Sequence, residues 1–488
     1  MSKRAYGCCL FALMILPLAG FCQQAFTLPA VIADHMVLQQ NTKAALWGTA
    51  VKGSRVQVSP EWTHKTYTAT ADAGGKWLLK IPTPRAGGPY QVVFTNNETR
   101  IVIKDVLIVE VWVCSGQSNM EMPLKGYKKQ PVLNAEQIIA DAANHPDIHV
   151  FRVPKVVSAV PVSDCKGSWQ VATAATAPDF SAIAYQYARI LNEKLHVPVG
   201  IISTYWGGTA VQSWMSEKNL ADFPDVWSTT RPDTITDPEK NPEHSPAILF
   251  NSMILPVAHY TIKGFVWYQG ESNREHPLLY RRLLPAMVKE WRTLWGSGRL
   301  PFYYVQIAPY GYYDPRHENF PAILRESQLL ALRDIPHAGM AVTLDIGKEK
   351  YIHPPDKTTV SQRLSYWALA KTYHKKGIAF ASPVFRKMKI KGSEACLYFD
   401  FAKDGLTTSG SALENFEMAG SEHVFHHATA VIVHHNRVKV QCDIVPAPVA
   451  VRYAFSNWVK GDLYNAAGLP ASSFRTDPPP NPVRRSVK

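Results

Sequence analysis

The first residues that suggest chemistry are a serine and the glycine two positions before it. Ser118 lies in residues 114–120, directly after a mostly apolar stretch, 106–113, that is long enough for one strand. A serine hydroxyl on a tight turn at a strand end, surrounded by backbone N–H groups, can attack an acyl carbon when a base is near. Because serine and glycine are also ordinary turn residues, this segment alone favours a simple turn.

Three more segments supply what such a serine needs. The Gly207-Gly208 pair follows an apolar run and lets backbone N–H groups approach a ligand closely. Residues 269–273, Gln-Gly-Glu-Ser-Asn, follow another apolar run and carry amides that could stabilise an oxyanion. His353 lies in a third loop, where it could act as a base. Singly these are a flexible turn, a hydrogen-bonded loop and a surface histidine, so the hypothesis depends on the set.

The elements that must position these residues alternate between strands and helices. Apolar runs predict strands at residues 106–113, 198–203, 264–268, 302–307 and 340–344. Amphipathic runs predict helices near residues 181–195, 277–295, 320–334 and 358–374. Such alternation predicts an α/β fold whose parallel sheet is covered on both faces and binds ligands at the carboxyl ends of its strands. The candidate residues fall at those ends.

Two regions with a β pattern flank this core. Short alternating strands predict a small β sandwich before it, at residues 44–48, 55–58, 74–80, 90–94 and 100–103. A second β region follows it, with strands expected at residues 396–401, 429–433, 438–442 and 449–455. Residues 224–246, rich in proline and aspartate, are expected to form a surface excursion. We therefore expect an N-terminal β domain (23–104), an α/β core (105–378), a C-terminal β domain (379–477) and a basic, proline-rich tail (478–488).

The first 22 residues are typical of a secretory signal peptide. Lys3 and Arg4 precede an apolar run, residues 8–21, that is too short to span a bilayer. We predict export and no membrane span. A retained anchor and lipid attachment at Cys22 are the alternatives, although the bulky Phe21 argues against the lipid. Cleavage would leave four of the seven cysteines, and the sequence does not select their pairing: Cys114, Cys165, Cys396 and Cys442.

Composition excludes several classes of protein. With 46% hydrophobic and 19% charged residues, the chain fits a globular protein better than a disordered one or a membrane bundle. The net charge of +13 is scattered, so no nucleic-acid partner is predicted; acidic sugars would suit such a surface, but solubility is the simpler interpretation. No metal is predicted, because Cys-x-x-Cys spacing is missing and these histidines lack a helical frame: His423, His426, His427, His434 and His435.

In this order, Ser118, Gly207-Gly208, residues 269–273 and residues 352–354 resemble the sialate O-acetylesterases. These are a branch of the SGNH-type serine esterases that is also similar to some acetylxylan esterases. Further matching segments extend the resemblance over nearly the whole mature chain: residues 34–39, 87–90, 451–453, 464–465, 468–470 and 474–477. The resemblance implies a flavodoxin-like α/β/α core and hydrolysis of O-acetyl esters on a sugar, without metal or cofactor. It does not address oligomeric state.

The same resemblance implies roles for single residues. Ser118 would be the nucleophile and His353 the general base. The oxyanion hole would use the backbone N–H groups of Ser118 and Gly207 and an amide of Gln269 or Asn273. We also expect four residues to bind substrate: Gln117, Trp206, Glu271 and Arg274.

One departure from the family pattern puts the third member of the triad in doubt. SGNH enzymes carry an aspartate two or three residues before the histidine, where this chain has Tyr351 and Lys350. Asp345 is our candidate for the missing acid, with Asp356 or a backbone carbonyl as alternatives. Three hypotheses therefore stand: a sialate O-acetylesterase, an acetylxylan or hemicellulose acetylesterase, and a glycan-binding protein without activity.

Overall fold

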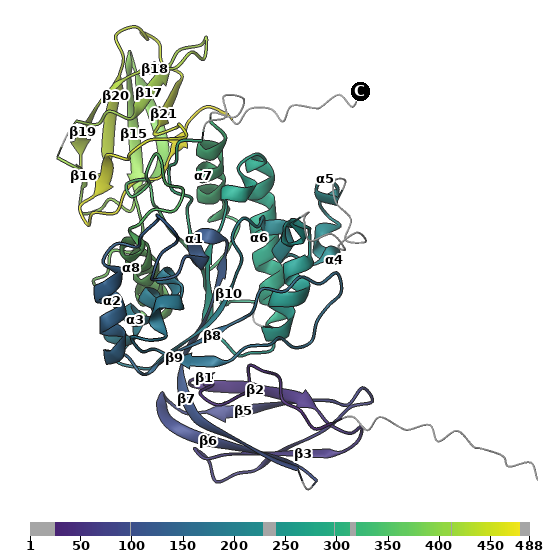
Figure 1. Ribbon diagram of the computed structural model, residues 1–488. Helices are drawn as coiled ribbons and strands as arrows, with labels where there is room; N and C mark the ends of the chain where they lie inside the picture. Colours follow the sequence, from purple (N-terminus) through teal and green to yellow (C-terminus); the bar gives the residue numbers. More distant parts are fainter. Residues whose placement is uncertain are drawn as a thin grey trace, which may run out of the picture.

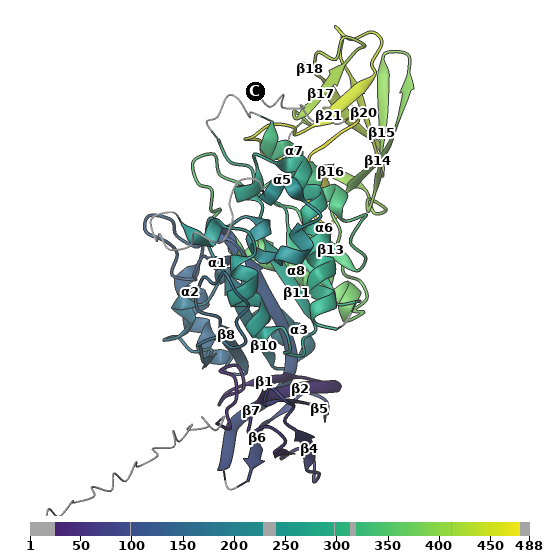
Figure 2. The ribbon, with the colours of Figure 1, turned by 90° about the vertical axis from the view of Figure 1, so that its right-hand side faces the viewer.

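A core of alternating strands and helices lies between two β-rich regions. The computed structural model describes residues 25–478, except 98, 228–240, 297, 313–318 and 411. The predicted signal peptide and most of the predicted tail lie outside the described residues. In Figure 1 the N-terminal sheets lie below the core and the C-terminal sheets above it, and Figure 2 shows the same order after a quarter turn.

The core sheet has the strand order β13-β12-β11-β7-β10-β8-β9. All neighbours pair in parallel except β8 and β9, which are antiparallel at one edge. This confirms the α/β fold with a parallel sheet. Its strands are β7 (Thr99–Gly116), β8 (Ile148–Arg152), β9 (Trp169–Val171), β10 (Val199–Tyr205), β11 (Gly264–Tyr268), β12 (Phe302–Val305) and β13 (Ala338–Ala341).

The strand order reverses on either side of β7. After β7 the chain builds β8, β9 and β10 on one side and then β11, β12 and β13 on the other. A crevice forms at the carboxyl ends of the strands where the order of an α/β sheet reverses, and ligands bind there. The end of β7, at Gly116, is therefore the expected place for the site.

Two pairs of helices cover the faces of the sheet. Helices α3 (Ala182–Leu195) and α8 (Lys357–Trp367) pack together on one face, and α6 (Pro277–Leu294) and α7 (Phe320–Ala331) pack together on the other. Successive side chains of β7 alternate between them, because Trp112 and Cys114 join the apolar cluster of α3 and α8, whereas Val111 and Val113 join that of α6. The shorter helices are α1 (Ser118–Glu121), α2 (Ala135–Asp141), α4 (Glu217–Leu220) and α5 (Pro224–Trp227).

The N-terminal region consists of two sheets that share one apolar cluster with the core. One sheet pairs β2 (Thr42–Thr49) with β5 (Lys76–Thr83). The other joins β4 (Tyr67–Thr70), β3 (Arg55–Pro60) and β6 (Gly87–Asn96) to the first half of β7, beside β1 (Val37–Gln39). The strands predicted separately at 100–103 and 106–113 are thus one strand, and the boundary that we proposed between residues 104 and 105 falls inside it.

The C-terminal region is antiparallel and irregular. Its two larger sheets have the orders β14-β15-β20-β19 and β18-β17-β21-β23, and β16 pairs with β22. The four strands predicted there are all strands. The bounds are β14 (Val384–Lys391), β15 (Glu394–Asp400), β16 (Leu406–Thr408), β17 (Phe416–Ala419), β18 (His426–His427), β19 (Thr429–His434), β20 (Arg437–Gln441), β21 (Ala450–Tyr453), β22 (Leu463–Asn465) and β23 (Phe474–Arg475).

Two of the open expectations concern membranes and disulfides. Within the described residues, no helix combines the length and the apolar composition needed to cross a bilayer. The four cysteines of the predicted mature chain are free thiols: Cys114, Cys165, Cys396 and Cys442.

Candidate active site

Ser118 is the first residue of α1, on the turn that follows β7. Gly116 ends the strand with φ +143°, and a Cβ there would lie 2.1 Å from the carbonyl oxygen of Tyr268 on β11. Only glycine fits this backbone and this close approach. The chain therefore turns sharply between β10 and β11 and presents a half-buried Ser118 at the carboxyl end of the sheet.

The imidazole of His353 meets this serine across 235 residues. Its Nε2 lies 2.8 Å from Ser118 Oγ, within hydrogen-bond distance. His353 lies in the loop between β13 and α8. The ring of Tyr127 packs edge-on against its imidazole, with the two ring centroids 5.4 Å apart. The structure thus brings together the two residues to which the sequence assigned nucleophile and base.

The other nitrogen of His353 faces an amide. Nδ1 lies 2.6 Å from Oε1 of Gln130. A tight turn delivers this glutamine, because Tyr127 and Gln130 exchange both backbone hydrogen bonds at 2.9 Å. With a carbonyl oxygen facing Nδ1, the proton belongs on Nδ1, and Nε2 is free to accept the hydroxyl proton of Ser118.

Neither candidate aspartate occupies this position. Asp345 forms a two-pronged ion pair with Arg363, with both N···O distances 2.7 Å. Asp356 caps α8 by accepting hydrogen bonds from the backbone N–H and the hydroxyl of Thr359 at 2.9 and 2.7 Å. The expectation that Asp345 orients His353 is therefore corrected: the buried guanidinium of Arg363 on α8 binds the carboxylate, and Gln130 takes the place beside the imidazole.

The surroundings keep His353 uncharged. Burial, assisted by the positive charge of Lys357, lowers the pKa of His353 to about 4. A neutral imidazole is the form that can accept a proton. At neutral pH the pair is thus ready for proton transfer from Ser118.

The backbone N–H of Gly207 points at a carboxylate. It donates a 2.6 Å hydrogen bond to Oε2 of Glu121, whose Oε1 accepts one from Lys155 at 2.5 Å. A Cβ on Gly207 would lie 3.2 Å from Ser118 Cβ, so this N–H is close to the nucleophile, as an oxyanion donor must be. Glu121 sits one helical turn after Ser118 and occupies the donor that we assigned to the oxyanion.

The amides of Gln269 and Asn273 brace loops. Gln269 Nε2 donates to the backbone oxygen of Thr209 at 3.2 Å and to Asn273 Oδ1 at 2.7 Å. Asn273 Nδ2 donates to Gln212 at 3.0 Å, and its Oδ1 also accepts from the backbone N–H of Val211. Both side chains are buried, and their described N–H groups bind one another's loop residues or the loop after β10.

The four predicted substrate contacts divide into two pairs. Gln117 and Glu271 are each 3% exposed. Gln117 Oε1 accepts the backbone N–H groups of Gly270 and Ser272, and Glu271 accepts a hydrogen bond from Asn119. Trp206 and Arg274 are half-buried: Lys155 lies over the Trp206 ring at 5.4 Å, and Arg274 lies over the Tyr312 ring at 5.1 Å. Of the four, only Trp206 and Arg274 are accessible to a ligand.

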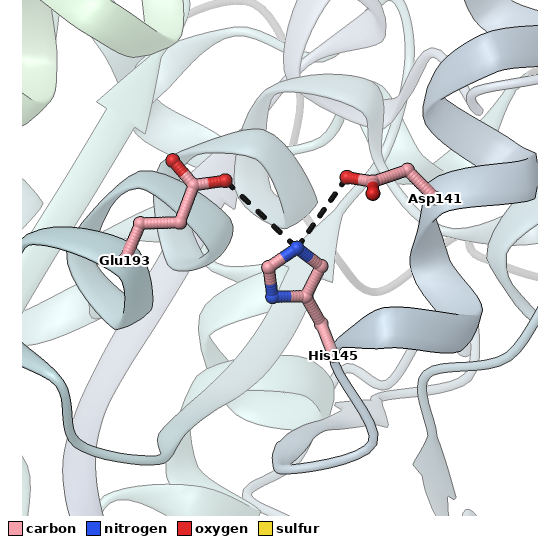
Figure 3. A group of neighbouring side chains, drawn as sticks. All are labelled: Asp141, His145 and Glu193. Carbon is pink, nitrogen blue, oxygen red and sulfur yellow. Dashed lines mark ion pairs between the residues drawn. The ribbon is translucent and has the colours of Figure 1, made fainter.

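One cluster of possible metal ligands lies elsewhere, between α2 and α3. Figure 3 shows Asp141 and Glu193 on either side of His145, with His145 Nε2 3.4 and 3.8 Å from their oxygens. The guanidinium of Arg189 also pairs with both carboxylates, at 3.6 and 2.7 Å. Because Arg189 and His145 already contact both carboxylates, the cluster is explained as an ion-pair network that joins the two helices.

Sequence reasoning missed several residues of this site. Gln130 and Tyr127 lie in a turn with two lysines, and nothing in their spacing marks them. Asn119 is the residue after the nucleophile, and Glu121 is three residues after it. Predicting a helical turn at this point would have placed Glu121 beside Ser118. Lys357 was visible as the first residue after a helix cap, but its burial depends on the tertiary fold.

The fold and this arrangement define an SGNH-type α/β hydrolase core. The sequence pattern of the family described as "Carbohydrate esterase, sialic acid-specific acetylesterase" matches residues 108–374, more than half of the chain. The chain therefore belongs to this family of carbohydrate acetylesterases.

Individual relatives support the same assignment. The chain is 28% identical to the sialate O-acetylesterase of Mus musculus over 458 residues, which cover 81% of this chain and 83% of the relative. It is 28% identical to the Homo sapiens sialate O-acetylesterase over 423 residues, or 79% of each chain. The solved structure of a carbohydrate acetylesterase from Xanthomonas citri superimposes with a TM-score of 0.84 and 36% identity, covering 93% of this chain and 100% of that one.

Proposed function

We propose that this protein is an exported carbohydrate O-acetylesterase that works through a covalent acetyl-serine. The observation that carries the proposal is the 2.8 Å contact between Ser118 Oγ and His353 Nε2 at the carboxyl end of the sheet. The family supports acetylesterase activity, and the serine mechanism is our inference from the geometry. The signal-like first 22 residues support export.

The proposed reaction has two halves. In the first, Ser118 Oγ attacks the acetyl carbon while its proton passes to His353 Nε2. The tetrahedral intermediate then expels the sugar oxygen, which takes that proton and leaves as an alcohol. In the second half, water attacks the acetyl-serine with His353 again as the base, and acetate departs as the proton returns to Ser118.

Gln130 takes the place of the usual triad acid in this proposal. A carboxylate both orients the histidine and stabilises the imidazolium, whereas a neutral amide only orients it. Gln130 therefore fixes the tautomer with Nδ1 protonated. The low pKa of His353 agrees with the lack of a negative charge at this position.

The oxyanion would bind backbone N–H groups. Ser118 begins α1, and the first N–H groups of a helix have no intrahelical acceptor. The N–H of Gly207 is the second donor. Glu121 must leave it before a carbonyl oxygen can enter, and Lys155, which already holds the other carboxylate oxygen, provides an ion-pair partner for the displaced side chain.

Sialic acid is the first candidate sugar, because the family description and the curated relatives name it. Its carboxylate would need a cation near the site. Arg274 is accessible at the Tyr312 ring, although it also pairs with Glu275 at 3.1 Å. Neutral acetylated polysaccharides such as xylan would instead need aromatic contacts, and Trp206 is the candidate.

Acetate release tests both levels of the proposal. Wild-type protein is expected to hydrolyse an aryl acetate, and Ser118→Ala and His353→Ala are expected to lose the activity while their melting temperatures stay unchanged. Undiminished hydrolysis by Ser118→Ala would overturn the assignment of the nucleophile, and glycan binding without acetate release would favour a lectin-like role.

Parallel assays on O-acetyl sialic acid and acetylated xylan identify the substrate class. N-terminal sequencing of protein from the culture medium or periplasm tests cleavage after residue 22.

A further inference from the structure

A single buried amide joins three of the loops that form the site. Asn119, beside the nucleophile, is 1% exposed. Its Nδ2 donates to Glu271 Oε1 at 2.7 Å and to the backbone oxygen of Ile352 at 3.1 Å. Its Oδ1 accepts a 2.7 Å hydrogen bond from Lys357 Nζ. One side chain thus links the serine turn, the loop after β11 and the histidine loop.

The chemistry of the partners fixes the orientation of this amide. An ammonium group only donates hydrogen bonds, whereas an ionised carboxylate and a backbone carbonyl only accept them. The Asn119 oxygen must therefore face Lys357, and its NH2 group must face Glu271 and Ile352. A flipped amide would place donors against the ammonium and an acceptor against two acceptors.

The two charged partners are buried on opposite sides of the amide. Glu271 is 3% and Lys357 1% exposed, so each needs a compensating charge or hydrogen bond. Burial raises the pKa of Glu271, and burial also lowers the pKa of Lys357 to about 7, against the attraction of Glu271 and Asp356. Glu271 Oε2 has no hydrogen-bond partner among the described residues. Burying such a set costs free energy, so its presence calls for a functional explanation.

The positions of Asn119 and Ile352 in the sequence suggest what this buried set does. Asn119 is the neighbour of Ser118, and Ile352 is the neighbour of His353. The Asn119–Ile352 hydrogen bond therefore ties the two backbones one residue away from the two reacting side chains. A shift of either loop would have to break this bond and turn the amide away from Lys357.

We propose that Asn119, held by Lys357 and Glu271, is a positioning residue that sets the distance between the Ser118 hydroxyl and the His353 imidazole. The inference deepens the proposed function and rests on it. Asn119 does not touch the reacting atoms and acts only through its neighbours. Its loss should lower the rate of serine acylation more than it weakens substrate binding.

Two isosteric variants test the proposal. Asn119→Asp replaces the NH2 group by an oxygen that faces Glu271 and Ile352, so the loops are pushed apart. A misplacement of about 1 Å can cost on the order of 10²-fold in rate, and we expect that loss in kcat with KM changed less than about threefold. Glu271→Gln can still accept the bond from Asn119 through its carbonyl oxygen, so its loss of kcat should be smaller than that of Asn119→Asp.

The C-terminal region offers a matched control. Asn465, 6% exposed, also joins separate segments: its Nδ2 donates to Ala381 and Phe401 at 3.1 and 3.2 Å, and its Oδ1 accepts from Leu469 at 3.0 Å. Asn465→Asp should lower the melting temperature without the loss of kcat. The readouts are kcat and KM on an aryl acetate, the labelling rate of Ser118 by a fluorophosphonate, and thermal melting.

The outcomes separate this inference from the proposed function. If wild-type protein releases acetate and Asn119→Asp is folded, with kcat and labelling rate within threefold of wild type, the positioning role is wrong although the esterase assignment stands. If Asn119→Asp does not fold, Asn119→Ser takes its place and must show the same selective loss of kcat. If wild-type protein releases no acetate from any substrate, the proposed function fails first.

Discussion

The neutral partner of His353 can be converted into a charged one by changing Gln130 to Glu. The variant keeps the length of the side chain and its position 2.6 Å from Nδ1. It supplies the carboxylate that SGNH enzymes use. The change therefore isolates the effect of a negative charge on the base.

The magnitude follows from the strength of the hydrogen bond. A neutral bond contributes about 0.5–1.5 kcal/mol and a bond between charged groups about 1.5–3 kcal/mol. The imidazolium that forms during acylation should therefore gain roughly 1–2 kcal/mol, or about 5- to 30-fold in kcat. The same charge raises the pKa of His353 from its low value near 4, typically by about 1 unit or more.

The assay is the pH dependence of kcat and kcat/KM on an aryl acetate between pH 4 and pH 9. At pH 8 the imidazole is neutral in both proteins, so the variant shows its full gain. As the pH falls, His353 is protonated earlier in the variant, and the advantage shrinks. Gln170→Glu, on the exposed face of β9, adds the same charge away from His353 and should leave the profile unchanged.

An unchanged acid limb in Gln130→Glu, together with unchanged kcat, would refute the reasoning. That result would mean that residue 130 does not contact Nδ1 during catalysis. Gln130→Met gives an independent check, because it removes the acceptor at similar volume. The expected result is a fall in kcat, since the wrong tautomer of His353 becomes accessible.

Three further predictions follow from the contacts of the site. The kcat/KM of the wild-type protein should stay constant until the pH falls toward about 4, because His353 must be neutral to act as the base. Lys357→Met removes a positive charge that lowers the pKa of His353, so the fall in kcat/KM of this variant should begin at a higher pH. Asp345→Asn should leave kcat within about threefold but lower the free energy of unfolding by about 2 kcal/mol. This is less than the roughly 3–5 kcal/mol that removal of a buried ion-pair partner costs, because the amide still accepts one bond from Arg363. A loss of kcat at unchanged stability would instead show that Asp345 has a catalytic role. Glu121→Gln weakens the hold on the Gly207 N–H and should raise kcat/KM by about fivefold, whereas a fall would show that this carboxylate keeps the glycine loop in place.

The sequence predicted those parts of the fold whose hydrophobic pattern is uniform. Strands β10, β11, β12 and β13 and the second half of β7 are largely buried and mostly apolar on both faces. Helices α3, α6 and α7 have a clear amphipathic period, whereas α8 buries several polar side chains. β8 was missed because it carries a polar residue, His149. That side chain is only 2% exposed, and its Nδ1 lies 2.7 Å from the backbone oxygen of His35. β9 is three residues long and lies at the edge, where pairing decides its conformation.

The site could be predicted as far as it depends on chain position. Ser118 and His353 were found because both follow core strands, and such residues meet at one edge of a parallel sheet. Their partners depend on contacts that no local pattern encodes. Asp345 looked like a triad acid until α8 placed Arg363 against it, and Gln130 reaches His353 only through a tight turn.

The polar residues after β11 show a related limit of sequence reasoning. Gln269, Glu271 and Asn273 follow a buried strand, so they required partners or a task. We assigned them to the oxyanion and the substrate. In the structure they instead bind residues of the loops after β7 and β10, so their hydrogen bonds hold the loops together.

The continuity of β7 constrains how this protein can be rearranged. Its first half completes the N-terminal sheet and its second half ends two residues before the nucleophile, in 18 uninterrupted residues. Removing the N-terminal sheets would leave the backbone N–H and C=O groups in the first half of β7 without their partner strands. A fusion or module swap that replaces the N-terminal sheets would therefore also have to rebuild the first half of β7, which runs directly into the turn that carries Ser118.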